Sequence, residues 1–165
     1  MNAKERAMLV AEKAHAGQSY DIYPYIYHVK QVTEIAEKLG YDESIVVACI
    51  LHDTLEDGNL SYNDILKSFG EEIAEIVYAV TDELGRNRKE RKLKTYPKIK
   101  NNWKAVAVKL CDRIANIKQS KDYNPKMLKC YQDEHDDFVN NIYNISHPQN
   151  ELGKAWDMLD EISKF

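Results

Sequence analysis

The chain has 165 residues, of which 44% are hydrophobic and 30% are charged, and its formal net charge is −4. At roughly 150 residues per domain this length predicts one domain, and the balance of apolar and charged residues excludes a disordered chain. The negative net charge argues against nucleic acid as a partner. The longest apolar run, Ile45–Leu51, is far shorter than the ~20 residues that span a bilayer, which argues against a membrane partner.

The first residues and the cysteines indicate where the protein works. Residues 1–6 carry charges of both signs and no apolar stretch of the signal-peptide type. Cys49, Cys111 and Cys130 are odd in number and far apart, which is typical of reduced cysteines that pack in a core. We therefore expect a cytoplasmic protein.

Apolar residues recur at helical spacing between the few Gly and Pro residues. Ile26, Val29 and Val32, for example, fall on one helical face, and Pro24 stands where the first turn of a helix tolerates proline. No segment shows a convincing period of two. These patterns predict an all-α fold, a single compact domain over residues 1–165 with about eight helices. The predicted helices cover residues 3–15, 25–39, 43–57, 61–69, 71–82, 103–119, 125 to the mid-140s, and the segment after Pro148 up to about residue 165.

One segment, residues 86–104, is strongly basic. It carries nine cations and one anion, so its net charge is +8 and that of the remaining chain is −12. One interpretation is a solvated basic helix face. The other is a binding surface for a small polyanion, because a strong local positive field on an acidic protein suits a small anion better than a duplex. Charge alone leaves both interpretations open.

Four ionisable residues follow the apolar run in the predicted helix 43–57. The helical repeat places His52 over Glu56 and Asp53 over Asp57. Because the run before them is apolar almost all round, we expect this helix to be buried. Four such groups at the end of a buried helix are costly unless they are paired or hold a cation. The alternative is an exposed helix end on which His52 caps carbonyl groups.

The predicted helix around Asp112 has the same organisation. Buried-type residues lead to Asp112 and Asn116, which lie four positions apart on one face, with the cations Lys109 and Arg113 on either side of Asp112. The alternative here is a surface salt bridge. His28 lies on the apolar face of its own predicted helix, where a histidine is either a satisfied core residue or a ligand.

These residues occur in the order His28, then the adjacent His52 and Asp53, then Asp112. This order resembles the metal-ligand signature of the HD phosphohydrolase superfamily. Residues 3 to about 120 are further similar to the hydrolase domain of RelA/SpoT-type proteins. The resemblance implies an HD-type helical fold, with residues 121–165 as closing C-terminal helices. The segments that carry it are Ala14–Gln18, Pro24–His28, Leu51–Asp57, Phe69–Gly70, Val80–Thr81 and Lys109–Asn116.

The donor set predicts the kind of metal. Two imidazoles and two carboxylates without a thiolate suit a first-row divalent ion such as Mn²⁺ better than a structural zinc ion. The family resemblance likewise implies one Mn²⁺ ion, with Fe²⁺ or another first-row ion as alternatives. Glu56, beside the ligands, is expected to orient or deprotonate the attacking water, and Asp57 is expected to assist. The predicted metal ligands are His28, His52, Asp53 and Asp112.

The substrate that the resemblance implies is guanosine 3′,5′-bis(diphosphate), from which the 3′-diphosphate would be removed. The basic segment then becomes a phosphate-binding arm beside the metal. Tyr20 stands where the family usually has an arginine that helps to hold the guanine base, so this tyrosine would stack on a base or would simply pack. The predicted substrate-binding residues are Tyr20, Arg86, Arg88, Lys89, Lys109 and Asn116.

Two alternative functions stay open at this point. An HD-type phosphatase could act on another nucleotide, such as a nucleoside monophosphate or NADPH, because the departure at Tyr20 concerns the base and leaves the metal ligands intact. A non-catalytic nucleotide-binding module is the third possibility, although such a module does not need the water-activating carboxylates. In each case the expected partner is a small-molecule nucleotide, and the sequence leaves the oligomeric state open.

Overall fold

The computed structural model describes residues 1–57, apart from the side chain of Asp57, and residues 60–165. Nearly all regular structure in this part is helical, which confirms the all-α prediction, although ten helices are present where about eight were predicted. The helices are α1 (Ala3–Ala14), α2 (Ile26–Lys38), α3 (Glu43–Leu51), α4 (Thr54–Asp57), α5 (Tyr62–Phe69), α6 (Glu71–Val80), α7 (Arg88–Lys100), α8 (Trp103–Tyr123), α9 (Pro125–Ile142) and α10 (Gln149–Ile162). Strands β1 (Ser19–Tyr20) and β2 (Tyr23–Pro24) form a short antiparallel hairpin.

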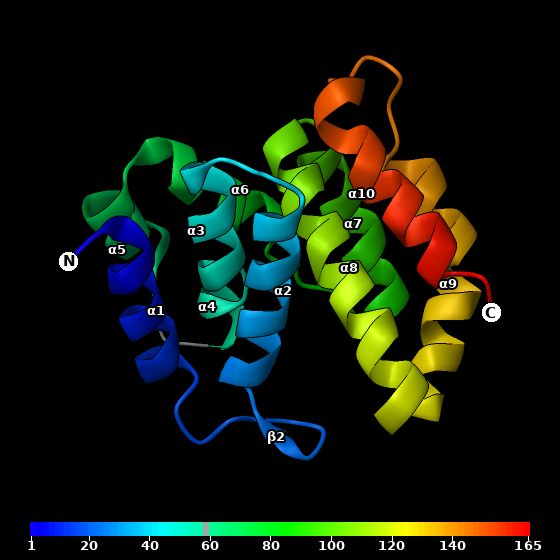
Figure 1. The fold of residues 1–165 in the computed structure, drawn as a ribbon, viewed down its shortest axis with the longest axis horizontal. Helices are drawn as coiled ribbons and strands as arrows, with labels where there is room; N and C mark the ends of the chain where they lie inside the picture. Colours follow the sequence, from blue (N-terminus) through cyan, green and yellow to red (C-terminus); the bar gives the residue numbers. More distant parts are fainter. Residues whose placement is uncertain (58–59) are drawn as a thin grey trace.

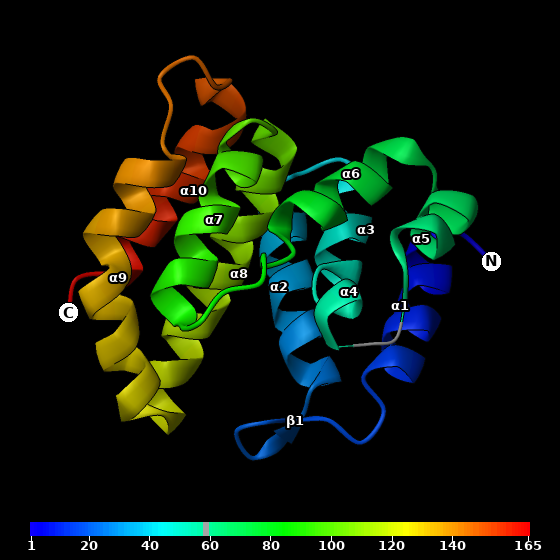
Figure 2. The same cartoon turned by 180° about the vertical axis from the view of Figure 1, so that it is seen from behind.

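Helix α8 lies at the centre of the fold, between the group formed by α1 to α3 and the group formed by α7, α9 and α10 (Figures 1 and 2). It packs against α2, α3, α6, α7, α9 and α10. Every residue from Ala105 to Ala115 except Lys109 is buried. Helix α3 is similar, because all residues from Ile45 to Leu51 are buried. Polar side chains on α8 and at the end of α3 are therefore held in the interior by the apolar residues around them.

The prediction of one continuous helix over residues 43–57 is wrong. Helix α3 ends at Leu51, and a new short helix begins at Thr54. Two side chains donate hydrogen bonds to carbonyl groups of the last turn. Nδ1 of His52 donates to the Cys49 carbonyl over 2.7 Å, and the Thr54 hydroxyl donates to the Leu51 carbonyl over 2.8 Å. Such side-chain bonds offer the backbone an alternative to continuing the helix. His52 and Asp53 therefore lie in a turn, which the helical spacing did not predict.

Helix α7 was not among the predicted helices. Asn87 begins it by accepting a hydrogen bond from the Glu90 amide over 2.9 Å, and Pro97 lies in its last turns. Only Thr95, Tyr96 and Ile99 of this helix are buried, so its apolar stripe is too narrow to stand out among the cations. The basic segment is thus mainly a helix that packs against α6, α8 and α9.

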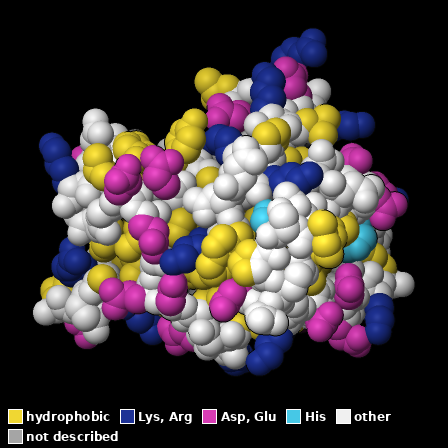
Figure 3. All heavy atoms as spheres, turned by 90° about the horizontal axis from the view of Figure 1, so that it is seen from above, with side chains coloured by type: hydrophobic (Ala, Val, Ile, Leu, Met, Phe, Trp, Pro, Cys, Tyr) yellow, Lys and Arg dark blue, Asp and Glu magenta, His cyan; other side chains and the backbone are white. Residues whose placement is uncertain are grey.

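Part of the positive charge of this segment is neutralised by neighbouring elements. The ammonium group of Lys104 lies 2.9 Å from Asp42 and 2.8 Å from Glu72, and that of Lys98 lies 2.8 Å from Glu83. On the face shown in Figure 3, acidic and basic side chains are interspersed, and apolar side chains form only small groups. Within the described residues, none of the helices combines the length and apolar character that crossing a bilayer requires.

Glu134 on α9 connects α7, α8 and α9. Its carboxylate accepts a hydrogen bond from Nε of Arg88 and another from Arg113 over 2.9 Å. The buried guanidinium of Arg113 also lies 4.9 Å from the ring centre of Tyr131 and 4.3 Å from that of Phe138. Burial opposes ionisation of Glu134, but the two arginines lower its pKa from the usual 4.5 to about 2. The carboxylate is therefore charged at neutral pH and balances two partly buried cations.

We expect Glu134→Gln to destabilise the protein in a pH-dependent way. A carboxyl group whose pKa is lower in the folded state than in the unfolded state stabilises the fold at any pH above its unfolded pKa. This stabilisation is lost as the pH falls towards the folded pKa. For Glu134 the difference between the two pKa values, 4.5 and about 2, corresponds to roughly 3 kcal/mol. The free energy of unfolding, measured by urea titration, should fall by about that amount at pH 7, and the gap to the wild type should close as the pH falls from about 5 towards 2.

The neighbouring Asp133 supplies the control for this measurement. It is exposed and pairs with Lys129 at the surface, so Asp133→Asn should change the free energy of unfolding by less than about 0.5 kcal/mol. Equal stability of Glu134→Gln and the wild type at pH 7 would contradict the stabilising role of Glu134.

Candidate metal centre and substrate cavity

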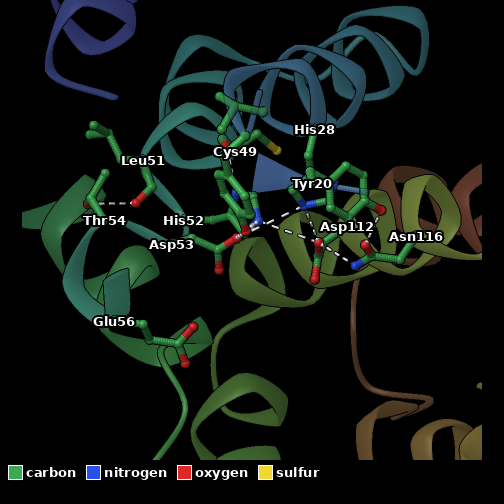
Figure 4. Close-up of polar contacts among 12 residues, drawn as sticks. Tyr20, His28, Cys49, Leu51, His52, Asp53, Thr54, Glu56, Asp112 and Asn116 are labelled. Atoms are coloured by element: carbon green, nitrogen blue, oxygen red, sulfur yellow. Dashed lines mark hydrogen bonds and ion pairs between the residues drawn. The ribbon is translucent and has the colours of Figure 1, made fainter. Parts of the chain in front are cut away.

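The four predicted metal ligands meet between α2, α3 and α8 (Figure 4). Nε2 of His28 lies 3.0 Å from Oδ1 of Asp112 and 4.0 Å from Oδ2 of Asp53. Nε2 of His52 lies 2.8 Å from Oδ2 of Asp53 and 3.4 Å from Oδ1 of Asp112. The two histidines and Asp112 are buried, and Asp53 is half-buried. Residues far apart in the sequence thus bring two imidazoles and two carboxylates into one cluster, in which the ligand atoms of His28, His52 and Asp53 lie within 4.8 Å of one another.

Three elements deliver these side chains, each for a local reason. His28 lies on the buried face of α2, next to Val29. His52 and Asp53 occupy the turn between α3 and α4, where the helix has ended and the side chains can leave the apolar core. Asp112 lies in the buried stretch of α8. The apolar residues of these elements fix the backbones, and the polar side chains converge as a consequence.

The cluster has the donor set and the unsatisfied groups of a cation site. Because Nδ1 of His52 donates to the Cys49 carbonyl, Nε2 is the ring atom that faces the carboxylates. This Nε2 atom is buried and forms no hydrogen bond of normal geometry with the described residues, although carboxylate oxygens lie 2.8 and 3.4 Å away. A divalent ion would coordinate Nε2 and balance the charges of Asp53 and Asp112. The residues present therefore fit a divalent metal ion.

The charges in the cluster depend on one another. Burial alone would lower the pKa of His52, but the adjacent Asp53 raises the pKa well above its usual value. Burial alone would raise the pKa of Asp112, but Lys109 and the two histidines hold the pKa well below its usual range. Burial opposes ionisation of Asp53 as well, but His52 in turn lowers the pKa of Asp53, so both aspartates are anionic at neutral pH.

Two further polar side chains, Lys109 and Asn116, contact the carboxylate of Asp112. Lys109 lies 3.1 Å from its Oδ2 atom, and Nδ2 of Asn116 donates to its Oδ1 atom over 2.9 Å. The hydroxyl of Tyr20 in turn donates to Oδ1 of Asn116 over 2.6 Å. The structure thus places Tyr20, Lys109 and Asn116, all predicted to bind substrate, next to the ligand Asp112.

A cavity of about 210 Å³ has the four ligands on its wall. The further predicted site residues that line it are Glu56, Arg88, Lys109 and Asn116. The predicted substrate-binding residues that do not line it are Tyr20, Arg86 and Lys89. The other predicted catalytic residue, Asp57, has its side chain outside the described residues.

Several wall residues of this cavity were given no role in the sequence analysis. They are Tyr25, Asp82, Arg113 and Tyr131, whereas Lys92 belongs to the predicted phosphate-binding arm. Asp82 directly follows Val80–Thr81, and Arg113 directly follows Asp112. Both residues therefore adjoin or belong to segments that carried the family resemblance. Tyr131 lies on α9, for which the sequence showed no motif. Helix α9 therefore contributes to the cavity wall as well as closing the core.

Glu56 lies at the rim of the cavity, apart from the four ligands (Figure 4). It does not stack on His52, because the chain turns between α3 and α4. Its Oε1 atom accepts a hydrogen bond from the Asp82 amide over 2.5 Å. The packed surroundings, with the negative charges of Asp53 and Asp82, raise the pKa of Glu56 to about 7. A carboxyl group with such a pKa exchanges a proton near neutral pH, as a general base must.

The cations of the predicted phosphate-binding arm separate into two groups. Arg88 and Lys92 face the cavity, and the ammonium group of Lys92 lies 2.7 Å from Asp82. Arg86, by contrast, is 89% exposed and pairs with Glu90 four residues later, and Lys89 is exposed on another part of α7. Lys109 on α8 adds a third cation to the cavity wall. The cations that line the cavity therefore come from α7 and α8, and not from a continuous run of sequence.

The sequence matches the HD domain family over residues 7–143, from α1 through α9. Among curated proteins it is similar to the guanosine-3′,5′-bis(diphosphate) 3′-pyrophosphohydrolase MESH1 of Drosophila melanogaster, with 33% identity over 105 residues that make up 62% of this chain and 59% of MESH1. It is also similar to the guanosine-3′,5′-bis(diphosphate) 3′-pyrophosphohydrolase of Aquifex aeolicus, with 33% identity over 120 residues, 69% of this chain and 17% of that protein. The chain thus spans 59% and 17% of the length of these relatives.

The fold is also found among solved structures. The chain superposes on a metazoan orthologue of SpoT that hydrolyses ppGpp, with a TM-score of 0.80, 23% sequence identity and coverage of 98% of this chain and 96% of that one. This likeness supports the all-α architecture along almost the whole chain. Because the family match covers residues 7–143, including His28, His52, Asp53 and Asp112, the chain belongs to the HD domain family, as the order of these residues predicted.

Proposed function

We propose that this protein is a divalent-metal-dependent phosphohydrolase that removes the 3′-diphosphate from guanosine 3′,5′-bis(diphosphate). The observation that carries the proposal is the convergence of His28, His52, Asp53 and Asp112 in the wall of a cavity. Four cations, Arg88, Lys92, Lys109 and Arg113, also line this cavity. The names of the two curated relatives support this substrate. The cytoplasmic location and the absence of nucleic-acid partners stay predictions.

The metal is proposed to be a single Mn²⁺ ion, or another first-row divalent ion such as Fe²⁺. Two imidazoles and two carboxylates without a thiolate favour such an ion over structural zinc. His28, His52, Asp53 and Asp112 would hold it, with Nδ1 of His52 fixed on the Cys49 carbonyl. When bound, the ion supplies Lewis-acid stabilisation of negative charge on the reacting phosphate.

Glu56 is proposed to accept the proton of the attacking water. Its Oε1 atom is held by the Asp82 amide, so its other carboxylate oxygen is left for the water. The water oxygen bonds to the phosphorus atom next to the 3′ oxygen, and the bond between that phosphorus and the 3′ oxygen breaks. The products are pyrophosphate and a nucleotide with a free 3′-hydroxyl. Asp57 is proposed to assist, on the sequence evidence alone.

Arg88, Lys92 and Lys109 are proposed to bind the phosphates. A substrate with two diphosphate groups brings several negative charges into a cavity that three aspartates, Asp53, Asp82 and Asp112, already line, so it needs cations in the cavity wall. Lys92 lines the cavity beside Asp82; burial and the nearby Lys109 lower its pKa, while Asp82 opposes this shift. A phosphate oxygen beside Lys92 would add a second counter-charge to the one that Asp82 supplies. Asn116, between Asp112 and Tyr20, is proposed to contact the substrate or the water from its position on the cavity wall.

A nucleotide panel tests the proposed reaction. The purified protein with Mn²⁺ should release pyrophosphate, and not orthophosphate, from guanosine 3′,5′-bis(diphosphate), and a chelator should abolish the release. The panel should include a nucleoside monophosphate and NADPH, which correspond to the alternative substrates. Release of orthophosphate from one of these, without pyrophosphate from the guanosine compound, would overturn the substrate assignment. Nucleotide binding without any product would instead indicate a binding module.

Glu56→Gln is the matched variant for the same assay. Gln keeps the shape and the hydrogen bond from the Asp82 amide but cannot accept a proton. We expect kcat to fall by roughly 10²- to 10⁴-fold while the Mn²⁺ content stays at the wild-type level. Loss of the metal together with the activity would show that Glu56 is a ligand and would contradict its role as the general base.

Removal of a ligand should remove the metal. His52→Ala or Asp53→Ala should lose stoichiometric Mn²⁺, measured by metal analysis after dialysis, and essentially all hydrolysis. His135→Ala is the control, because His135 is half-buried on α9 and contacts the ring of Phe165. Stoichiometric metal in either ligand variant would refute the site.

Two lysines on α7 separate phosphate binding from surface charge. Lys92→Gln removes a cation on the cavity wall and should raise KM for guanosine 3′,5′-bis(diphosphate) by roughly 10- to 100-fold, with a smaller effect on a monophosphate. Lys89→Gln removes an equal charge from an exposed position of the same helix and should leave KM unchanged within about twofold. Equal effects of the two substitutions would indicate a general field of the basic helix and contradict specific contacts.

A further inference from the structure

Tyr20, at the end of β1, reaches the metal centre through one intermediate side chain (Figure 4). Its hydroxyl donates to Oδ1 of Asn116 over 2.6 Å, and Nδ2 of Asn116 donates to Oδ1 of Asp112 over 2.9 Å. That Oδ1 atom is the one that lies 3.0 Å from Nε2 of His28 and 3.4 Å from Nε2 of His52. The Tyr20 hydroxyl thus fixes the amide of Asn116, which in turn fixes the oxygen that Asp112 turns towards the two histidines.

The ring of Tyr20 has a second contact with the same centre. It packs against the imidazole of His28, with 4.5 Å between the ring centres. Tyr20 is half-buried, and it is not part of the wall of the cavity that the ligands share. Its position therefore suits support of the ligands better than contact with a substrate in that cavity.

The hairpin that carries Tyr20 is anchored to the same part of the fold as Asn116. Asp21, at the turn, accepts hydrogen bonds from Gln119 over 3.3 Å and from Asn124 over 3.0 Å, at the end of α8 and the start of α9. Asp21 has φ of 52°, a left-handed conformation that Asp tolerates better than most residues. The turn therefore holds Tyr20 at a fixed distance from Asn116 on α8.

The other side of the hairpin contacts the second carboxylate. The hydroxyl of Tyr25, directly after β2, donates to Oδ2 of Asp53. The two aspartates of the cluster thus each receive support from a tyrosine of the hairpin segment, Asp53 directly from Tyr25 and Asp112 through Asn116 from Tyr20. Hydrogen-bonded groups behind the ligands orient them and raise metal affinity.

We propose that Tyr20 is a positioning residue that orients Asp112 through Asn116 and thereby increases the affinity of the site for its divalent ion. This inference rests on the proposed function in that the four residues must bind a metal, and it does not depend on which nucleotide is hydrolysed. It replaces the contact with a nucleotide base that the sequence suggested for Tyr20. The hydroxyl, and not the ring alone, is the group that acts.

Metal binding without substrate tests the proposal. Free Mn²⁺ is measured by electron paramagnetic resonance during titration of the wild type and of Tyr20→Phe, which keeps the ring and removes the hydroxyl. The dissociation constant for Mn²⁺ should rise by roughly 10- to 100-fold in Tyr20→Phe. Tyr23→Phe, which removes a hydroxyl from the same hairpin where it contacts Tyr123, should bind Mn²⁺ within about twofold of the wild type. An unchanged constant in Tyr20→Phe overturns the proposal.

A double-mutant cycle shows whether Tyr20 acts through Asn116. Asn116→Ala removes the side chain that links Tyr20 to Asp112. The double variant, with both Asn116→Ala and Tyr20→Phe, should therefore bind Mn²⁺ no more weakly than Asn116→Ala alone. Additive losses would contradict the path through Asn116. The single Asn116 variant also keeps the test decisive if Tyr20→Phe does not fold, because unchanged Mn²⁺ affinity in Asn116→Ala overturns the proposal by itself.

Kinetics at saturating Mn²⁺ distinguish support of the metal from contact with the substrate. In that condition Tyr20→Phe should recover a KM for guanosine 3′,5′-bis(diphosphate) close to the wild-type value. A raised KM with unchanged Mn²⁺ affinity would indicate that Tyr20 contacts the substrate and would overturn its positioning role. A wild type that binds Mn²⁺ but hydrolyses no nucleotide would overturn the proposed reaction only, whereas a wild type that binds no Mn²⁺ would overturn both.

Discussion

The constraint on which the rest of the structure depends is the placement of two carboxylates, one buried and one half-buried, at the junction of α2, α3 and α8. Asp53 and Asp112 repel one another in an environment that solvates charge poorly, so each needs compensation from the protein or from a cation. His28 and His52 supply part of it, and Lys109 supplies more for Asp112. Because these partners come from separate elements, the site exists only when the whole core is packed.

A second set of contacts connects Glu56, the proposed base, with Lys92, a proposed phosphate-binding residue. Asp82, in the segment after α6, donates its backbone amide to Glu56 and pairs its carboxylate with Lys92. One residue thus sets the distance between the group proposed to accept a proton and a group proposed to hold phosphate. The distance between the Glu56 carboxylate and the Lys92 ammonium group therefore depends on the loop that carries Asp82, as well as on the helices that carry Glu56 and Lys92.

The sequence predicts those parts of the protein that depend on local pattern. The buried stretches of α3 and α8 were evident from apolar runs, and the order of histidines and aspartates identified the family. The break at His52 was not predicted, because it depends on hydrogen bonds from His52 and Thr54 to carbonyl groups, which compete with a helix of good propensity. Helix α7 was not predicted because its few buried residues are outnumbered by cations.

The residues that the sequence did not reveal act across long separations in the chain. Arg113 follows the ligand Asp112 directly, but its charge is balanced by Glu134, and its guanidinium packs on Tyr131 and Phe138. All three of these partners lie on α9, which also lines the cavity through Tyr131. A displacement of α9 would therefore disturb Arg113 and Arg88 together, because both pair with Glu134 on this helix. Helix α9 thus helps to shape the cavity through Tyr131, while α2, α8 and the turn after α3 position the proposed metal ligands.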